Sequence, residues 1–538
     1  MKKIFSFLLI SISFHVFSQD ELFDKGFNSI TQQKIQAQLQ FLASDWTNGR
    51  EPGTRGIESA AEYIRSMFMY AGLEPGDRLK PYQHIRYQDD SDVDYFQTFD
   101  LIKAPRLFEG RLTVKDNTNA FIFPAKTDFN LISGYSSSFA LNHAYVFVGY
   151  GLRNSRLNYD AYKGLDVKGK IVVALRGFPG YMDMESELAR YFTNAGKNIN
   201  VSELEQDKVD LAKEKGAAAV IFVNPTIDFP GIAESNIYKY SARKWYEGNT
   251  PWGVTAHRYR IPEATGDNMV VLEVSKRAGS ALLAGSDYSV EDFYNFRINN
   301  LEARLKTMHS KTINLEVTRE EELIKVKNVL ALVKGEDSTK SVVVGAHFDH
   351  LGTYEGRIYN GADDNGSGTV AVMMLAEAFK ESGIKPKYNM IFAAWTAEEK
   401  GLLGSRYFAD HPTSDSVLYY MNFDMIGRLD ERDTIRHKAK MVYTGSVPAL
   451  QSTIEEGLKK YDVDLKITFS PRSLPRGGSD HTSFSMKGIP VSYFLAGWHN
   501  DYHQPWDETG EIAYDNMELI IKSAYIQLWE IANGNVFK

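Results

Sequence analysis

Histidines and carboxylates gather in the C-terminal half of the chain, where predicted strands end. Seven of the 12 histidines lie between positions 347 and 503. Four buried strands are each followed by such residues: His347 and Asp349 after 341–346, Glu398 and Glu399 after 389–394, Asp424 after 419–423, and His499 and His503 after 490–495. Because sites in open α/β sheets form at the carboxyl ends of strands, we expect these side chains to meet at one edge.

These residue types suit a catalytic zinc site, since imidazole and carboxylate without thiolate are typical of catalytic rather than structural zinc. In an extended segment His347 and Asp349 point the same way, so Asp349 can orient the imidazole. The turn 363–368 could place a carboxylate between two metals. The pair Glu398–Glu399 offers one ligand and one base for the proton of a metal-bound water. Each feature alone also fits a structural role, but their joint occurrence at strand ends indicates a metal site.

Other catalytic signatures are missing from the sequence. It contains no His-Glu-x-x-His and no Gly-x-Ser-x-Gly, which argues against a zincin-type peptidase and a serine hydrolase. The segment 164–171 approaches a phosphate-binding loop but lacks the final Ser or Thr. The chain has no cysteine, which excludes disulfides, thiolate metal sites and a cysteine nucleophile.

The elements around these residues alternate between strand and helix. Helices are predicted at 368–380 and 516–532, between and after the strands, and an amphipathic helix at 58–71. This pattern predicts an α/β fold with a mainly parallel central sheet and helices on both faces. From 135 to 295 short apolar runs alternate with Gly-rich turns, which predicts an inserted β-rich domain.

The N-terminus has the pattern of an export signal. Lys2 and Lys3 precede an apolar run, 4–17, and Val16 and Ser18 fit a small-residue cleavage site. The run is short of the ~20 residues that a membrane span needs, so we favour a signal peptide over the alternative of a membrane anchor. We therefore expect export to the periplasm or the outside, and no stable membrane insertion.

The expected organisation is a signal peptide at 1–18, an N-terminal part of the catalytic domain at 19–134, the inserted domain at 135–295, and the rest of the catalytic domain at 296–538. The formal charge is −8, and removal of the leader's lysines makes the chain more acidic. An acidic chain argues against a nucleic-acid partner.

Several motifs together resemble zinc peptidase family twenty-eight, which includes secreted bacterial leucyl aminopeptidases. The motifs that carry the resemblance are GAHFDH (345–350), GADDNGSG (361–368), TAEEKGLLGS (396–405), NFDMIG (422–427) and DYH (501–503). Gly49 to Gly53 and the helix after it resemble that family's N-terminal segment. The segments 146–151, 166–172 and 216–223 are similar to the protease-associated domain often inserted in such enzymes.

The resemblance implies two zinc ions per chain and assigns roles by motif. The implied ligands are His347, Asp364, Glu399, Asp424 and His503, with Asp364 as the bridge. It also implies Glu398 as general base, Asp349 as the residue that orients His347, and Tyr502 as a hydroxyl that stabilises the oxyanion. Asp480 and His481 match a further family motif and are interpreted as pocket wall. His350, His411 and His437 are interpreted as structural or surface residues.

The sequence thus predicts a secreted zinc-dependent metallo-aminopeptidase that hydrolyses the N-terminal peptide bond of peptides. Three alternatives remain open: a glutamate carboxypeptidase-like dipeptidase, a glutaminyl cyclase-like enzyme, and a non-catalytic receptor-like protein. A cyclase would need only one zinc, and a receptor would have lost ligands. Aromatic residues surround His503 in the sequence, namely Phe494, Trp498, Tyr502 and Trp506. They predict a pocket for a large apolar first side chain, or alternatively part of the core.

Overall fold

The chain forms two compact units in the computed structural model. Unit 1 comprises Met1–Phe99 and Lys325–Lys538, and unit 2 comprises Asp100–Ile324, so unit 2 is inserted into unit 1. The structure describes residues 18–79, 95–105, 108–125, 127–133, 138–155, 158–178, 201–223, 257–262, 269–284, 289–290, 292, 311–354, 356–430 and 435–537. The predicted signal peptide lies outside these residues except for Ser18.

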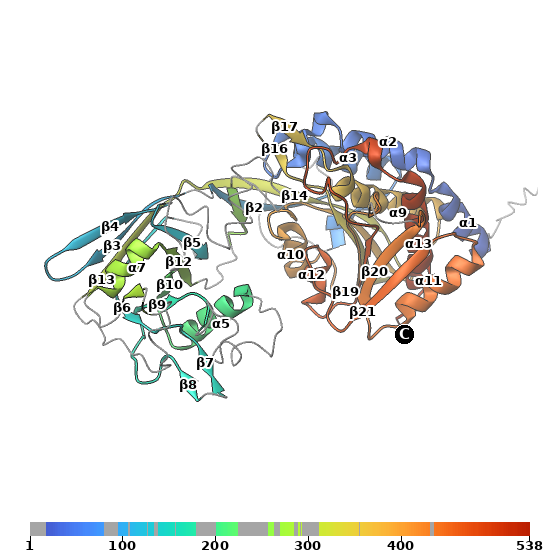
Figure 1. Ribbon diagram of the computed structural model, residues 1–538. Helices are drawn as coiled ribbons and strands as arrows, with labels where there is room; N and C mark the ends of the chain where they lie inside the picture. Colours follow the sequence, from blue (N-terminus) through green and yellow to red (C-terminus); the bar gives the residue numbers. More distant parts are fainter. Residues whose placement is uncertain are drawn as a thin grey trace, which may run out of the picture. The chain divides into compact units, whose positions relative to one another are not determined.

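Unit 1 contributes the strands β14, β18, β15, β19, β22, β20 and β21, in that order, to one sheet, and β1 pairs with β14 (Figure 1 labels β14, β19, β20 and β21). The same sheet continues beyond β14 with β2 and then β11, and β11 belongs to unit 2. The strands are β1 (Glu74–Pro75), β2 (Phe96–Pro105), β11 (His257–Arg260), β14 (Glu322–Val333), β15 (Asp337–His347), β18 (Tyr388–Trp395), β19 (Ser416–Phe423), β20 (Lys438–Thr444), β21 (Lys466–Arg472) and β22 (Val491–Leu495). The unit boundary falls within β2 and β14. The central strands β18, β15, β19 and β22 are parallel, as predicted. On either side, β14 and β20 run antiparallel to their neighbours.

Helices cover both faces of this sheet, which confirms the predicted α/β class. They are α1 (Gln19–Ser29), α2 (Gln32–Leu42), α3 (Arg55–Tyr70), α9 (Gly368–Ser382), α10 (Leu403–Asp410), α11 (Ala449–Lys460), α12 (His481–Ser485) and α13 (Tyr514–Ala532). Val342 and Val344 of β15 pack in the cluster that contains α9 and α13. Val343 packs instead with Phe408 of α10 and Phe484 of α12. Alternate residues therefore face opposite layers, because successive side chains of a strand point to opposite faces.

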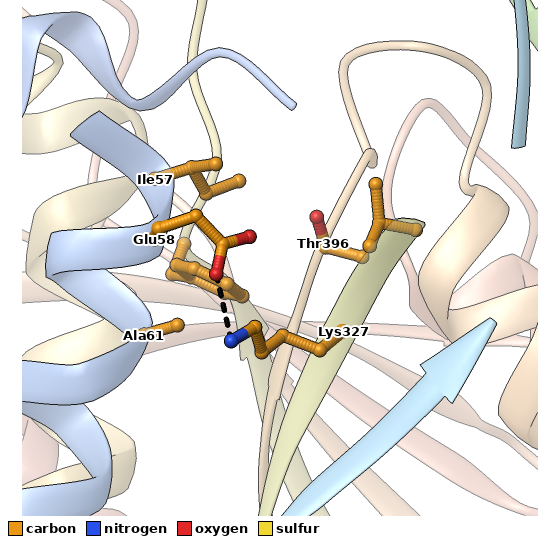
Figure 2. Close-up of a pocket in the computed structure, with 7 residues that line it drawn as sticks. Ile57, Glu58, Ala61, Lys327 and Thr396 are labelled. Carbon is orange, nitrogen blue, oxygen red and sulfur yellow. Dashed lines mark ion pairs between the residues drawn. The ribbon is translucent and has the colours of Figure 1, made fainter. Parts of the chain in front are cut away.

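Unit 1 also contains shorter elements, three of which lie near one another. They are the 3-10 helix η1 (Asp45–Arg50) and the two strands of a hairpin, β16 (Gly352–Tyr354) and β17 (Arg357–Tyr359). A small pocket lies beside α3, and the ion pair between Lys327 and Glu58 crosses it at 2.7 Å (Figure 2). Its lining includes Phe348 and Thr396 but none of the implied zinc ligands.

Unit 2 contains an eight-stranded sheet with the order β4-β3-β13-β6-β9-β10-β12-β5. Its strands and helices are β3 (Glu109–Lys115), β4 (Ala120–Pro124), β5 (Phe129–Ser133), β6 (Phe139–Phe147), β9 (Ile171–Leu175), α5 (Val201–Glu214), β10 (Ala219–Val223), β12 (Val270–Val274), α7 (Lys276–Leu283) and β13 (Thr312–Thr318). The short strands β7 (Arg153–Asn154) and β8 (Tyr159–Asp160) pair with each other. The strands β9, β10 and β12 are buried along their whole length and parallel. In the described part of the chain, no helix is long and apolar enough to cross a membrane.

Candidate metal centre

The carboxyl ends of the central strands bring most of the predicted polar residues together. His347 is the last residue of β15, and its carbonyl oxygen accepts a hydrogen bond from Thr369 Oγ1 of α9 at 2.7 Å. Asp364 lies in the turn η5 (Ala362–Ser367), and the peptide between Asp364 and Asn365 is cis. Gly361 begins this turn with φ +56°, and a Cβ there would lie 2.2 Å from the carbonyl oxygen of Asp364. The turn therefore requires glycine at 361.

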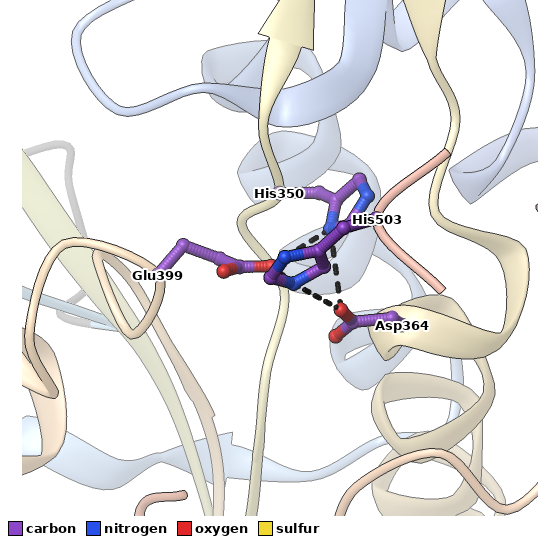
Figure 3. Close-up of side chains that lie close together, drawn as sticks. All are labelled: His350, Asp364, Glu399 and His503. Atoms are coloured by element: carbon purple, nitrogen blue, oxygen red, sulfur yellow. Dashed lines mark hydrogen bonds and ion pairs between the residues drawn. The ribbon is translucent and has the colours of Figure 1, made fainter. Parts of the chain in front are cut away.

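One cluster joins His350, Asp364, Glu399 and His503 (Figure 3). His503 Nε2 lies 2.9 Å from Asp364 Oδ2 and 3.2 Å from Glu399 Oε1. His350 Nδ1 lies 2.9 Å from the same Glu399 oxygen and 3.8 Å from Asp364 Oδ2. Four nitrogen and oxygen ligands thus converge on one point.

A second cluster joins His347, Asp364 and Asp424. His347 Nε2 lies 3.5 Å from Asp364 Oδ1 and 3.5 Å from Asp424 Oδ1. Asp364 therefore belongs to both clusters, and a different carboxylate oxygen serves each of them. This is the arrangement expected of a ligand that bridges two metal ions.

The donor set fits divalent zinc. All five implied ligands lie in the clusters and are buried or nearly so, and they offer the imidazole and carboxylate atoms that catalytic zinc prefers. Asp364 Oδ2 and His503 Nε2 are buried, yet neither makes a hydrogen bond within the described residues. Buried polar atoms normally have partners, so these two atoms are accounted for if they bind a cation.

The carboxylates give the site a strongly negative field. Burial alone would lower the pKa of His503, but Glu399 and Asp364 raise it to about 10. Burial would likewise lower the pKa of His347, and Glu398, Asp424 and Asp364 raise it well above its usual value. The same negative field attracts a metal cation. The extra protons on His347 and His503 occupy the place of that cation when no metal is bound.

The two neighbouring glutamates lie in opposite electrostatic environments. Burial raises the pKa of Glu398 well above its usual value. Burial would also raise the pKa of Glu399, but His503 and His350 outweigh it and hold that pKa well below its usual value. Glu398 is in neither cluster, and its Oε2 lies 3.9 Å from His347 Nε2. Glu399 thus lies where a metal ligand would lie, and Glu398 lies close to the clusters without belonging to either.

Asp349 supports the site in a way that the sequence did not predict. Its carboxylate accepts the backbone N–H groups of Glu398 and Glu399 at 2.9 and 3.3 Å. His347 Nδ1 lies 3.2 Å from the main-chain oxygen of Asp349 and 3.8 Å from its carboxylate. Asp349 therefore contacts His347 mainly through its backbone, while its side chain holds the glutamate loop. Burial raises the pKa of this carboxyl to about 6.

The remaining predicted residues lie around the clusters. The Tyr502 ring stacks on His503 with centroids 3.9 Å apart, and Trp498 meets Tyr502 edge-on at 5.0 Å. His499 is not in a cluster, because its Nε2 lies 3.1 Å from Asp363 Oδ2. Asp480 is fully buried, and burial raises its pKa to about 7. His481, which stacks on Tyr493, has a pKa lowered by burial to about 4. His411 and His437 lie in neither cluster.

Two buried residues of the site were not singled out from the sequence. His350 was interpreted as structural or surface, but β15 ends at His347, and His350 lies in the cluster with Asp364, Glu399 and His503. Asp507 accepts the backbone N–H groups of Asp363 at 3.0 Å and of Asp364 at 2.9 Å, and so holds the bridging residue's turn. Its position four residues after His503 carries no spacing signal of this role.

Comparison with known proteins agrees with this fold. Residues 328–525 match Peptidase family M28, and residues 138–246 match the PA domain. Residues 328–525 are therefore similar to this peptidase family, and residues 138–246 are similar to the PA domain, as the sequence motifs indicated.

Individual relatives were found among curated proteins and solved structures. A probable leucine aminopeptidase 2 of Arthroderma benhamiae is 34% identical over 173 residues, which are 32% of this chain and 33% of that protein. Leupeptin-inactivating enzyme 1 of Streptomyces exfoliatus is 32% identical over 35% of this chain and 41% of that protein. These matches span only about a third to two fifths of the relatives' length. The solved aminopeptidase from Aneurinibacillus sp. strain AM-1 has the same fold with a TM-score of 0.50, at 19% identity over 95% of this chain and 96% of that one.

Proposed function

We propose that this protein is an exported two-zinc aminopeptidase that removes N-terminal residues from peptides. The observation that carries the proposal is the position of Asp364, whose two carboxylate oxygens face two separate ligand groups. His503 and Glu399 would hold one zinc together with Asp364, and His347 and Asp424 would hold the other. The names of the relatives, which are leucine aminopeptidases among others, support the same activity.

Glu398 is the group best placed to move the proton. It lies beside His347 without belonging to either cluster, and a raised pKa brings a carboxylate nearer to the range in which a general base works. Zinc, when bound, acts as a Lewis acid and lowers the pKa of water. Glu398 would accept the proton of the attacking water and return it to the leaving amine. The Tyr502 hydroxyl would donate to the developing oxyanion.

The choice of the N-terminus as the cleaved end follows from charge. The site is rich in carboxylates, which suit an α-ammonium, whereas a carboxypeptidase needs a cationic partner for the substrate carboxylate. Arg428 lies near the motifs, but its Nη1 is bound to Asp501 at 2.7 Å. The geometry therefore favours an aminopeptidase over a glutamate carboxypeptidase-like enzyme.

Export is part of the proposal and rests on the N-terminal sequence. Ser18 caps α1, since its side chain accepts the N–H of Glu21 and the Glu21 carboxylate accepts the N–H of Ser18. Cleavage after Ser18 would remove this capping box, and a Ser or Thr cap is worth about 1 kcal/mol. Sequencing the N-terminus of the secreted protein would fix the site.

The central experiment combines metal content with substrate choice. We expect elemental analysis of the purified protein to give close to two zinc ions per chain. We expect hydrolysis of peptides with a free N-terminus and none of the same peptides after N-acetylation. Cleavage from the C-terminus, or equal cleavage of acetylated peptides, would contradict the aminopeptidase assignment. A single tight zinc with cyclisation of N-terminal glutamine would instead support the cyclase.

A further inference from the structure

Arg50 is a fully buried arginine in a left-handed turn beneath the metal centre. It has 0% of its surface exposed and ends the helix η1, just before α3. Asn48, Gly49 and Arg50 all have positive φ, at +49°, +71° and +51°. The turn lies close against the β16–β17 hairpin, since a Cβ at Gly49 would lie 2.4 Å from the carbonyl oxygen of Gly352. This backbone aims the arginine side chain inward.

The guanidinium donates four hydrogen bonds, all to main-chain carbonyl oxygens. Nε donates to Phe348 at 2.6 Å, and Nη2 donates to Gly361 at 2.9 Å. Nη1 donates to both Leu42 and Asn360, each at 2.6 Å. The planar fork therefore joins three separate segments of the chain at one point.

Two of these segments carry the metal ligands. Phe348 lies between His347 and Asp349 in the loop after β15. Asn360 and Gly361 lead directly into the turn that carries Asp364. The third segment is the end of α2, which anchors the fork to the helical layer. In addition, the carbonyl oxygen of Arg50 accepts the backbone N–H of His350 at 3.3 Å.

Close packing alone does not explain why a charged arginine is buried at this position. No ion pair of Arg50 is found among the described residues, although the charges of Asp349, Asp507, Asp364 and Glu399 act on it from farther away and raise its pKa. Burial lowers the pKa of Arg50 to about 10, which reflects the cost of removing the cation from water. The left-handed conformation at Asn48 and Arg50 adds backbone strain, because both residues carry a Cβ. Strain of this kind is retained where the surroundings fix a particular geometry, and it gathers at functional sites.

We propose that Arg50 is a positioning residue that sets the separation between the His347 loop and the Asp364 turn, and through it the shape of both zinc sites. The inference rests on the proposed two-zinc function. Since Asp364 serves both clusters, a shift of its turn relative to His347 changes both sites together. The shape of the guanidinium group is required as well as its charge, because its three nitrogens donate to carbonyl oxygens of three separate segments.

The test uses two replacements at position 50 and one matched control in the full-length protein. Arg50→Lys keeps the charge but has a single nitrogen in place of the fork, and Arg50→Met keeps a long apolar stem without any donor. Ile454→Ala on α11 is the control, since this fully buried side chain lies outside the metal centre and its truncation leaves a cavity that destabilises the same core.

Two measurements separate the outcomes. Zinc affinity, measured by competition with a chromogenic chelator, should weaken roughly 10–100-fold in Arg50→Lys, as for other residues that support metal ligands, and stay within about twofold in Ile454→Ala. Hydrogen exchange of the metal-free protein should show faster exchange at 347–350 and 361–366 in Arg50→Lys alone. Arg50→Met removes all four of these hydrogen bonds and should exceed Arg50→Lys in both effects, or fail to fold.

Native zinc affinity and unchanged exchange in Arg50→Lys would overturn the proposal, as would equal zinc loss in Ile454→Ala. The exchange measurement needs neither zinc nor peptide. If the unaltered protein binds zinc but cleaves no peptide, the proposed activity fails and the role of Arg50 stands. If the unaltered protein binds no zinc, both fail.

Discussion

Asp364 is the residue on which the two clusters depend. Its carboxylate oxygens face His347 on one side and His503 on the other, and its backbone N–H is held by Asp507. A bridging carboxylate must present both oxygens in a fixed plane, so its main chain needs support as much as its side chain. Asp507 and Arg50 supply that support. Asp507 accepts the backbone N–H of Asp364, and Arg50 donates to the carbonyl oxygens of Asn360 and Gly361, which precede the turn.

The two glutamates after β18 should respond differently to the same substitution. Glu398→Gln should keep the fold and both zinc ions but lower kcat about 10²–10⁴-fold, because it removes a base and no ligand. Glu399→Gln should lose zinc from the cluster that contains His503, because a neutral amide is a poor zinc ligand. Zinc content and kcat would be measured on the same preparations. The reverse pattern would mean that the roles within the pair are exchanged.

Zinc affinity should rise with pH. The carboxylates raise the pKa of His347 well above its usual value and that of His503 to about 10, so both imidazoles hold a proton at neutral pH when no metal is bound. Zinc binds the neutral ring and must displace these protons. Between pH 6 and 8 the apparent affinity should therefore increase by up to roughly tenfold per pH unit for each imidazole. Chelator competition across this range would show the slope, and a flat profile would contradict the assignment of both histidines.

Among the elements, the central strands of the unit 1 sheet were predicted from the sequence, whereas β20 and β21 at one edge of that sheet were not. The strands β15, β18 and β19 are fully buried at their carboxyl ends, so their apolar runs stand out in the sequence. The strands β20 and β21 were not predicted because β21 is largely exposed and β20 alternates, which leaves no continuous apolar run. Most residues of the two clusters stood out in the sequence because they follow these strands, and the metal roles of the residues came from the family resemblance.

The missed residues have a different explanation. Arg50 and Asp507 act on backbone groups that are distant in the sequence, and His350 depends on how the chain turns after β15. Neither residue type nor spacing reveals such contacts before the fold is known. In unit 2 the sheet includes β3 and β13, which lie outside the expected insertion 135–295. Long-range strand pairing of this kind has no local signal in the sequence.

Unit 2 contains a buried charge cluster at the ends of its central strands. Lys208 Nζ donates to the carbonyl oxygens of Leu175 and Gly177 and lies 3.3 Å from Glu205. Nearby, Arg176 pairs with Glu273 at 2.6 Å. Burial lowers the pKa of Lys208 to about 8, so it is still charged at pH 7. The cluster fixes α5 to the ends of β9, since Lys208 and Glu205 belong to that helix.

Removing one partner of this cluster should cost more than removing both. Lys208→Met should lower the free energy of unfolding of unit 2 by about 3–5 kcal/mol at pH 7, because it leaves Glu205 buried with only Arg176 Nε, 4.0 Å away, as a cation. Adding Glu205→Gln should recover part of this loss, since the remaining amide carries no charge. Urea unfolding of the two single variants and the double variant forms a mutant cycle. Additive losses would show that the two side chains do not stabilise each other.

On the scale of the whole molecule, the described residues that could hold a metal lie in unit 1. A ligand that binds only the folded state stabilises the cooperative unit that contains its site. Removal of zinc with a chelator should therefore destabilise unit 1 selectively. If the free zinc concentration had been 100 times the dissociation constant of a site, losing zinc from that site should lower the free energy of unfolding by about 2.7 kcal/mol. Hydrogen exchange would report both units in one sample, with β15 and β19 for unit 1 and β9 and β10 for unit 2. Exchange in β15 and β19 should accelerate on chelation and return to its original rate when zinc is restored, while β9 and β10 serve as the internal control. Equal acceleration in both units would show that the metal stabilises the chain as one cooperative body, and no acceleration in unit 1 would contradict a zinc centre at Asp364.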